Sequence, residues 1–144
     1  MEALEDMFFR AAMKPSLFQT LVRPYLYKKH RDETGYTDPE VVHEESKRLI
    51  NEAEEKFRKN SDYFYGNHDR ELKVEVNGYK FRRPWAIADG FDKNAEILGP
   101  VSYMGVGYRP FGTVTMKKRE GNERPRIVAS RETRTMWNAQ GFPQ

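Results

Sequence analysis

The sequence predicts an α/β chain in which N-terminal helices precede a β-hairpin and a strand–helix–strand unit. Apolar residues recur at helical spacing over residues 1–58, and alternating residues around Asn77-Gly78 predict the hairpin. A short apolar run at 84–88 is followed by a helix and then by a second strand at 106–115. Such short βαβ units build parallel sheets or barrels.

Residues 1–32 are predicted to form an amphipathic helical unit that Pro15 interrupts, because proline removes a backbone donor and clashes with the preceding turn. The basic end Lys28–Arg31 suits the negative end of a helix dipole. Two interpretations stay open. The helices pack on the rest of the protein, or they lie on a membrane or line an apolar tunnel.

A second helix is predicted to start near Pro39 and to run to Arg58. Thr37 or Asp38 can cap its free amides, and proline fits the first helical turn. We expect its charged side chains to face solvent. Residues 59–70 are polar and rich in turn residues, which predicts a linker. The histidines are expected to be surface residues and not metal ligands: His30, His43 and His68.

The composition excludes several classes of function. The chain has 25 basic and 22 acidic residues, so its net charge of +3 does not argue for nucleic acid. It has no cysteine, which excludes disulfides, thiolate metal sites and a cysteine nucleophile. We identify no signal peptide, and no apolar run approaches the ~20 residues of a membrane span.

The second half of the chain is predicted to contain short elements. The hairpin pairs Leu72–Val76 with Tyr79–Phe81 across a type I′ turn. The expected elements that follow are a buried strand at 84–88, a short helix at 94–104, a strand at 106–115, a basic loop at 116–126 and a short strand at 127–129. The remainder of the chain is polar.

In a parallel barrel, the loops that follow the strands carry the site. The segment Ala88–Asn94 and the residue Thr113 fall at such ends. Gly90 permits close approach of the backbone to a flat ligand, and Lys93 can place a positive charge beside an anionic one. Asn138 can both donate to and accept from a planar, amide-like substrate.

Four blocks in a fixed order carry a family resemblance. They are Ala88-Asp89-Gly90-Phe91-Asp92-Lys93-Asn94, Gly112-Thr113-Val114-Thr115, Gly121-Asn122-Glu123-Arg124-Pro125-Arg126 and Asn138-Ala139-Gln140-Gly141-Phe142. Together these blocks resemble the first part of dihydroorotate dehydrogenase, over residues 71–144. The upstream segment Asp38–Glu44 resembles an N-terminal helix of the membrane-associated, quinone-using class of that family.

The resemblance implies a TIM (β/α)8 barrel of which this chain holds only the first βα units, because such a barrel needs ~250 residues and eight strands. It divides the chain into an N-terminal helical extension at 1–58, a linker at 59–70 and the start of a flavin-binding barrel at 71–144. The catalytic base is then absent from this chain.

The resemblance also implies the ligands and the residues that contact them. The residues near flavin mononucleotide (FMN) are Ala88, Asp89, Gly90, Lys93 and Thr113, and those near orotate are Lys93, Asn138, Gly141 and Phe142. Asp89 departs from the family, which usually has a small apolar residue there, and it puts an extra carboxylate near the flavin. Ala139 stands where arginine is usual.

The implied reaction oxidises dihydroorotate to orotate in pyrimidine biosynthesis and passes electrons to a quinone through the N-terminal helices. The chain is expected to be a truncated product, an excised segment or half of a split enzyme, inactive without a C-terminal remainder or partner chain. Its expected location is the cytoplasm or the cytoplasmic face of a membrane, as a peripheral protein.

An alternative function is a non-catalytic basic module that binds phosphates of RNA or of an anionic membrane. The residues that favour it are Lys117, Lys118, Arg119, Arg124, Arg126, Arg131 and Arg134. Glutamates are interspersed among them, so we do not expect nucleic acid as a partner.

Overall fold

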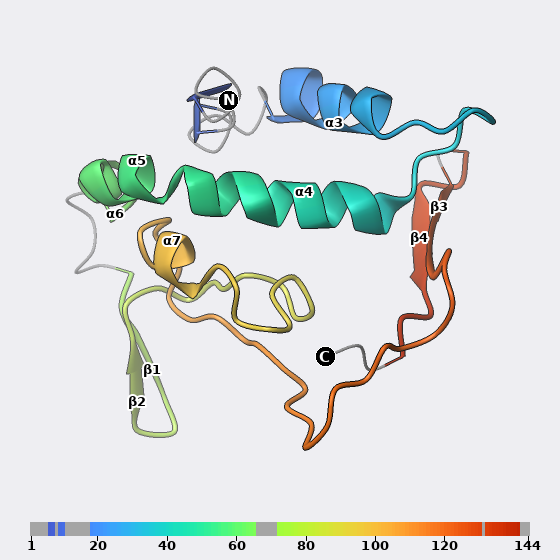
Figure 1. Cartoon of the computed structure of the whole chain (residues 1–144). Coiled ribbons are helices and arrows are strands. Elements are labelled where there is room, and N and C mark those ends of the chain that lie inside the picture. The colour runs from blue at the N-terminus through green and yellow to red at the C-terminus, as the bar shows by residue number, and fades with distance from the viewer. Residues whose placement is uncertain (1–5, 8, 11–17, 66–71, 131, 142–144) are drawn as a thin grey trace.

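The computed structural model describes residues 6–7, 9–10, 18–65, 72–130 and 132–141. The helices are η1 (Phe18–Val22), α3 (Arg23–Lys29), α4 (Pro39–Glu52), α5 (Glu54–Lys59), α6 (Ser61–Tyr65) and α7 (Leu98–Ser102). The strands are β1 (Val74–Val76), β2 (Tyr79–Phe81), β3 (Ile127–Ser130) and β4 (Thr135–Asn138). Figure 1 shows α4 at the centre, with α3 on one side and α7 on the other. The strands β3 and β4 lie beside the N-terminal end of α4 (Figure 1).

Helix α4 begins where the sequence predicts. The Asp38 side chain accepts a hydrogen bond from the Glu40 amide at 2.8 Å, and Pro39 occupies the first turn. Asp38 is therefore the cap, whereas the Thr37 hydroxyl donates to the Tyr27 carbonyl at 2.7 Å. The expectation of a single helix as far as Arg58 is wrong, because α4 ends at Glu52 and α5 follows.

The core lies around the apolar side of α4. Its buried side chains come from the N-terminal helices, from α4 and α5 and from the region of α7: Phe9, Val22, Leu26, Val42, Leu49, Ile50, Ala53, Phe57, Ile97 and Val101. The rings of Phe9 and Phe57 meet edge to face at 5.3 Å. Of the two interpretations left open for the N-terminal helices, packing on the rest of the protein therefore holds for Val22 and Leu26.

The expectation that the charges of α4 face solvent is wrong for Glu40 and Lys47. Their exposed fractions are only 4% and 6%. Both meet oppositely charged side chains from distant segments, which compensates the cost of removing a charge from water. The expectation of surface histidines is also wrong for His30 and His43, which are both half-buried, and His68 lies outside the described residues.

The predicted hairpin is confirmed. Strands β1 and β2 are antiparallel, and their register pairs Glu75 with Lys80. Asn77 and Gly78 have φ values of 50° and 80°, as a type I′ turn requires at both central positions.

The buried strand predicted at 84–88 is not formed, and neither is the long strand at 106–115. A single parallel bridge joins Ala86 to Tyr108, next to a hydrogen bond from the Gly107 amide to the Trp85 carbonyl at 2.9 Å. Trp85 is 44% exposed. A parallel strand is normally covered on both faces and paired on both edges, and the described residues supply one point of pairing.

The remaining elements differ in length from the expected ones. Helix α7 is shorter than the helix predicted at 94–104, and α6 lies within the stretch predicted as a linker. Strand β3 confirms the strand expected at 127–129. Its antiparallel partner β4, which pairs Ile127 with Asn138, lies in the polar remainder, for which we predicted no element.

The described part of the chain is therefore a mixed helix-and-strand structure with two small antiparallel sheets. Within these residues, no helix is both long and apolar enough to cross a membrane.

Candidate functional site

The segment Ala88–Asn94 is a tight turn with two different faces. The Phe91 amide donates to the Ala88 carbonyl at 3.2 Å, and Gly90 has a φ of +80°, a conformation that favours glycine. The first three residues are exposed, whereas Phe91 is half-buried and Asp92 is buried. The first half of the turn is therefore exposed to solvent, and Phe91 and Asp92 pack against the rest of the protein.

Asp92 has a structural role that the sequence analysis missed. Its carboxylate accepts hydrogen bonds from the amides of Glu96 at 2.8 Å and Ile97 at 3.1 Å. These amides precede α7 and would otherwise lack partners, as at the start of other helices. The carboxylate thereby fixes the turn against the helix that follows it.

Lys93 is half-buried, and its carbonyl accepts a hydrogen bond from the Gly112 amide at 2.9 Å. This bond brings the second motif block next to the first. Thr113, the following residue, is exposed. Two of the residues expected to contact the flavin are thus brought near each other by their backbones.

A cavity of about 500 Å³ lies between the N-terminal helices and the site segments, and we call it the α3–α4 cavity. Leu26, Tyr27 and Val42 line its helical side. Ala88, Asp89, Gly90, Phe91, Ile127, Met136, Asn138 and Gln140 contribute to the rest of its wall. The turn at 88–91 and Asn138 therefore line the same cavity.

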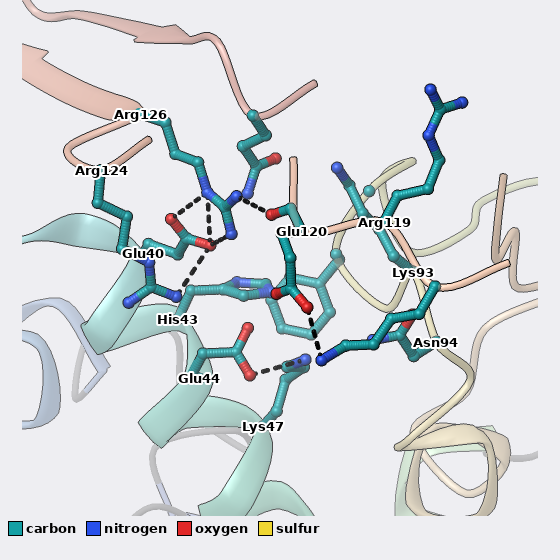
Figure 2. Close-up of a pocket in the computed structure, with 14 residues that line it drawn as sticks. Glu40, His43, Glu44, Lys47, Lys93, Asn94, Arg119, Glu120, Arg124 and Arg126 are labelled. Carbon is teal, nitrogen blue, oxygen red and sulfur yellow. Dashed lines mark hydrogen bonds and ion pairs between the residues drawn. The ribbon is translucent and has the colours of Figure 1, made fainter. Parts of the chain in front are cut away.

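A second, smaller hollow of about 210 Å³ is lined mostly by charged and polar side chains, and we call it the polar cleft. Figure 2 shows that residues of α4 form one side of the cleft. Lys93 and Asn94 lie across from them, and Glu120 comes from the loop before β3 (Figure 2). Lys93 lines the polar cleft and not the α3–α4 cavity, whereas Gly90 lines both.

His43 joins α4 to the Ala88–Asn94 turn. Its ring meets the Phe91 ring edge to face, with 4.8 Å between the centroids. Burial lowers the pKa of His43, and the nearby Lys47 ammonium lowers it further, against smaller opposing effects that include a backbone hydrogen bond with Phe91. His43 is therefore set up as a neutral imidazole that packs against the turn.

Glu40 is held by two arginines of the third motif block. The Arg126 Nη2 atom is 2.6 Å from Glu40 Oε1, and Nε is 2.9 Å from Oε2. Arg124 Nη2 is 3.2 Å from Oε1. Hydrogen bonding from Arg126 lowers the pKa of Glu40 against the opposing effect of burial, and Arg124 adds to the lowering. The carboxylate is thus charged and paired at neutral pH.

The third and fourth motif blocks are joined by hydrogen bonds. The Asn122 side-chain amide donates to the Ala139 carbonyl at 2.6 Å, and the Asn122 backbone amide donates to the Gln140 carbonyl at 3.1 Å. Gly141 has a φ of +70°, and a Cβ atom there would lie 3.3 Å from the Asn122 amide nitrogen. The two blocks therefore pack so closely that glycine suits this position.

The expected site residues are only partly brought together. Ala88, Asp89, Gly90 and Asn138 share the α3–α4 cavity, and Lys93 lies in the adjoining polar cleft. Gly141 lies beside Asn122, in the block that precedes β3. Phe142 lies outside the described residues.

The polar face of α4 is the part of the site that sequence reasoning missed. Glu40, His43, Glu44 and Lys47 have the i, i+3, i+4, i+7 spacing that puts residues on one face of a helix. Lys47 pairs with Glu44 at 2.9 Å and with Glu96. Burial alone would lower the pKa of Lys47, but these two carboxylates raise it. The regular spacing was the signal that could have revealed this face.

In the residues that the structure describes, no cluster of three or more histidine, aspartate or glutamate side chains is suited to a metal ion.

The comparisons with known proteins agree with the motif blocks. The family profile for dihydroorotate dehydrogenase matches residues 71–144, just over half of the chain. A dihydroorotate dehydrogenase (quinone) from Gloeobacter violaceus is 34% identical over 123 residues, which are 85% of this chain and 33% of the relative. The enzyme of the same name from Photobacterium profundum is 40% identical over 81 residues, 56% of this chain and 24% of the relative.

A third relative with this name, from Psychrobacter, is 30% identical over 122 residues, 85% of this chain and 32% of the relative. The chain thus spans between about a quarter and a third of the length of these three relatives. The matches that cover 85% of this chain extend well upstream of residue 71, into the helical part.

Proposed function

Because the chain belongs to the dihydroorotate dehydrogenase family, we propose that it forms one wall of the flavin and orotate site of a quinone-dependent enzyme of pyrimidine biosynthesis. In this proposal, residues 1–58 are the helical extension, 59–70 the linker and 71–144 the start of an incomplete α/β barrel. The whole reaction, oxidation of dihydroorotate to orotate, needs the remaining strands from a C-terminal segment or a partner chain.

The observation that carries the proposal is the α3–α4 cavity. It joins the exposed turn at 88–91 to Asn138, some 50 residues later in the chain, within a wall that is otherwise mainly apolar. Binding sites for flat cofactors are typically concave and apolar, with a few polar groups that fix orientation. The segments that meet here are the first and fourth motif blocks.

The residues of this wall fit one face of a flavin ring. Gly90 has no side chain in the way and adopts a positive φ, so that its backbone can approach a flat ligand closely. Ala88 is small and exposed beside it. When bound, FMN accepts a hydride from the substrate. Asp89, which lines the cavity, and Thr113, which does not, are proposed as further contacts of the flavin.

Lys93 is the residue on which the proposed site depends most. Its ammonium group can hold a positive charge beside an anionic orotate carboxylate and beside the flavin edge, while Asn138 can bond the planar amide groups of the substrate. Gly141 and Phe142 are proposed to complete the substrate loop. The catalytic base is proposed to come from the remainder of the barrel.

The helical side of the α3–α4 cavity is the proposed route for the quinone. Leu26, Tyr27 and Val42 give it an apolar and aromatic lining. A quinone ring is itself apolar and flat, so such a wall suits it. We propose that these helices also make peripheral contact with the cytoplasmic face of a membrane.

Flavin binding tests the proposal. The purified chain is titrated with FMN and followed by flavin fluorescence, alone and after co-expression with the C-terminal two thirds of the Gloeobacter violaceus relative. We expect weak or no binding alone, and bound flavin with dihydroorotate oxidation in the complemented protein. Lys93→Met should abolish that activity, whereas Lys80→Met, on the hairpin, should not.

Two results would overturn the proposal. Stoichiometric flavin on the isolated chain would show that its site is more complete than one wall. Failure of the complemented protein to bind flavin, although it folds and co-purifies, would remove the family function from this chain.

The second candidate, a basic module for RNA or anionic membranes, is not favoured. Lys118 pairs with Glu120 at 2.8 Å, and both Arg124 and Arg126 pair with Glu40. These contacts occupy much of the charge on which phosphate binding would depend. Arg131 lies outside the described residues.

A further inference from the structure

We propose that Glu40 is a positioning residue whose carboxylate, through Arg126, holds the Asn138 end of β4 against the α3–α4 cavity. The inference deepens the proposed function and rests on it, because Asn138 matters as a ligand for the substrate. It assigns a task to a residue of the helical extension that itself does not touch the proposed flavin wall.

Glu40 forms a largely buried ion pair with Arg126. The exposed side-chain fractions are 5% for Glu40 and 9% for Arg126, so both groups are largely removed from water. The guanidinium group offers Nε and Nη2 to the two carboxylate oxygens, with three N–O distances between 2.6 and 3.1 Å. A planar fork of this kind fixes direction as well as distance.

Arg126 also binds the backbone of its own loop through its remaining nitrogen, Nη1. Nη1 donates to the carbonyl oxygens of Glu120 at 2.6 Å and Asn122 at 3.0 Å. The guanidinium group therefore binds α4 on one side and the backbone of its own loop on the other. Loss of Glu40 would leave a largely buried cation without its counter-charge and would free the loop to move.

Hydrogen bonds connect this loop to the residues that follow Asn138. The Ala139 amide donates to the Arg126 carbonyl at 2.7 Å, and Asn122 bonds the carbonyls of both Ala139 and Gln140. The two residues directly after Asn138 are thus held by the loop that Arg126 organises. Asn138 is exposed. Its position is therefore set by this backbone network and by its pairing with Ile127.

The same helix lines the cavity and supplies Glu40. Val42 and His43 contribute to the wall of the α3–α4 cavity, two and three residues after Glu40. A displacement of this end of α4 therefore acts on the quinone side and on the substrate side together. Residues that bind a substrate must be held to within a fraction of an ångström. A short network of hydrogen bonds such as this one can hold Asn138 in that way.

Amide hydrogen exchange of the full chain tests the proposal without any ligand. In Glu40→Gln, the amides of Asn122 and Ala139 should exchange about tenfold faster or more, because a charged hydrogen bond is replaced by a neutral one. The amides of Leu49 and Ala53 should stay protected, which shows that the helical core is folded. Arg126→Lys, which keeps the charge but loses the fork, should have the same effect on these two amides.

Glu45→Gln is the matched control. Glu45 lies on α4 and its carboxylate is bound by Arg48 and Lys29, which lower its pKa to about 2, but it does not contact the loop. If this control speeds exchange at Ala139 as much as Glu40→Gln does, general weakening of α4 explains the effect and the proposal is wrong. Unchanged exchange at Ala139 in both Glu40→Gln and Arg126→Lys would also overturn it.

A second measurement separates the positioning role from a structural one. In the complemented enzyme, Glu40→Gln should raise the KM for dihydroorotate several-fold, whereas Glu45→Gln should not. If the wild-type complemented protein shows no activity, the proposed function fails, while the exchange experiment still decides whether Glu40 holds β4. If the exchange rises and the KM does not change, Glu40 is structural only.

Discussion

The helical region around α4 and the stretch 106–141 are held together in different ways. Around α4, Leu26 and Phe57 are fully buried. In the later stretch, Val114 is 79% exposed and Met116 is fully exposed. That stretch is joined to α4 by ion pairs and hydrogen bonds such as Glu40–Arg126.

The difference shows which part of the chain has its own core. Burial of apolar surface is the main favourable term in folding, so the helical region has a source of stability that residues 106–141 largely lack. Exposed apolar side chains that gather along one stretch typically mark a surface that another protein segment covers. This agrees with the proposal that further barrel strands complete the site.

The largest expected effect is the loss of a core side chain. Phe57→Ala should lower the free energy of unfolding by about 3–5 kcal/mol, because it leaves a cavity beside Phe9. Urea denaturation followed by circular dichroism measures this. Phe111→Ala, at a site that is 56% exposed, should change it by no more than about 0.5 kcal/mol. Equal losses in both variants would contradict the comparison.

A smaller effect is expected at the turn that joins the two regions. Asp92→Ala removes the acceptor for the amides of Glu96 and Ile97 and should cost about 0.5–2 kcal/mol, as the loss of a helix cap does. The same unfolding experiment applies. Asp89→Ala, three residues earlier and exposed, is the control and should be nearly neutral. A larger loss from Asp89 would reverse the roles assigned to the two carboxylates.

Acid should weaken the contact between the regions. The folded state lowers the pKa of Glu40, so its contribution to stability is present above the ordinary glutamate pKa of about 4.3 and is lost as the pH falls through the lower, folded value. The charged groups that face it are the guanidinium groups of Arg126 and Arg124. Glu40→Gln should remove this component of the acid sensitivity.

The measurement is the urea midpoint of wild type and Glu40→Gln from neutral pH downward. Other carboxylates titrate in both proteins, so the difference between the two curves isolates Glu40. A difference that is constant with pH would mean that the Glu40 carboxylate is not linked to folding.

The smallest effect on stability is expected for the exposed apolar stretch. Met116→Gln should leave the free energy of unfolding within about 0.5 kcal/mol of wild type but should reduce self-association of the isolated chain. Sedimentation velocity measures the association. Val76→Gln, on the hairpin, is the control that should leave it unchanged. A wild-type chain that sediments as a monomer would contradict an uncovered face.

Several features follow from short stretches of sequence and were predicted. The Asn77-Gly78 turn is confirmed because its residues tolerate positive φ at both positions. The cap at Asp38 is confirmed because it depends only on an amide two residues away. The four motif blocks point to the family that the comparisons support. The individual site residues taken from them, such as Lys93, stay predictions.

The sequence by itself determined the turns, the start of α4 and the order of the motif blocks, because these depend on neighbouring residues and their backbone preferences. Only the tertiary structure decided that Glu40 and Lys47 are buried, that residues 84–88 form one bridge and that Asn138 lines the same cavity as the Ala88–Phe91 turn. Each of these outcomes depends on a partner tens of residues away, which local preference does not specify. The charges of α4 were expected to face solvent because the side chains that pair with them, such as Arg126 and Glu96, lie far away in the sequence.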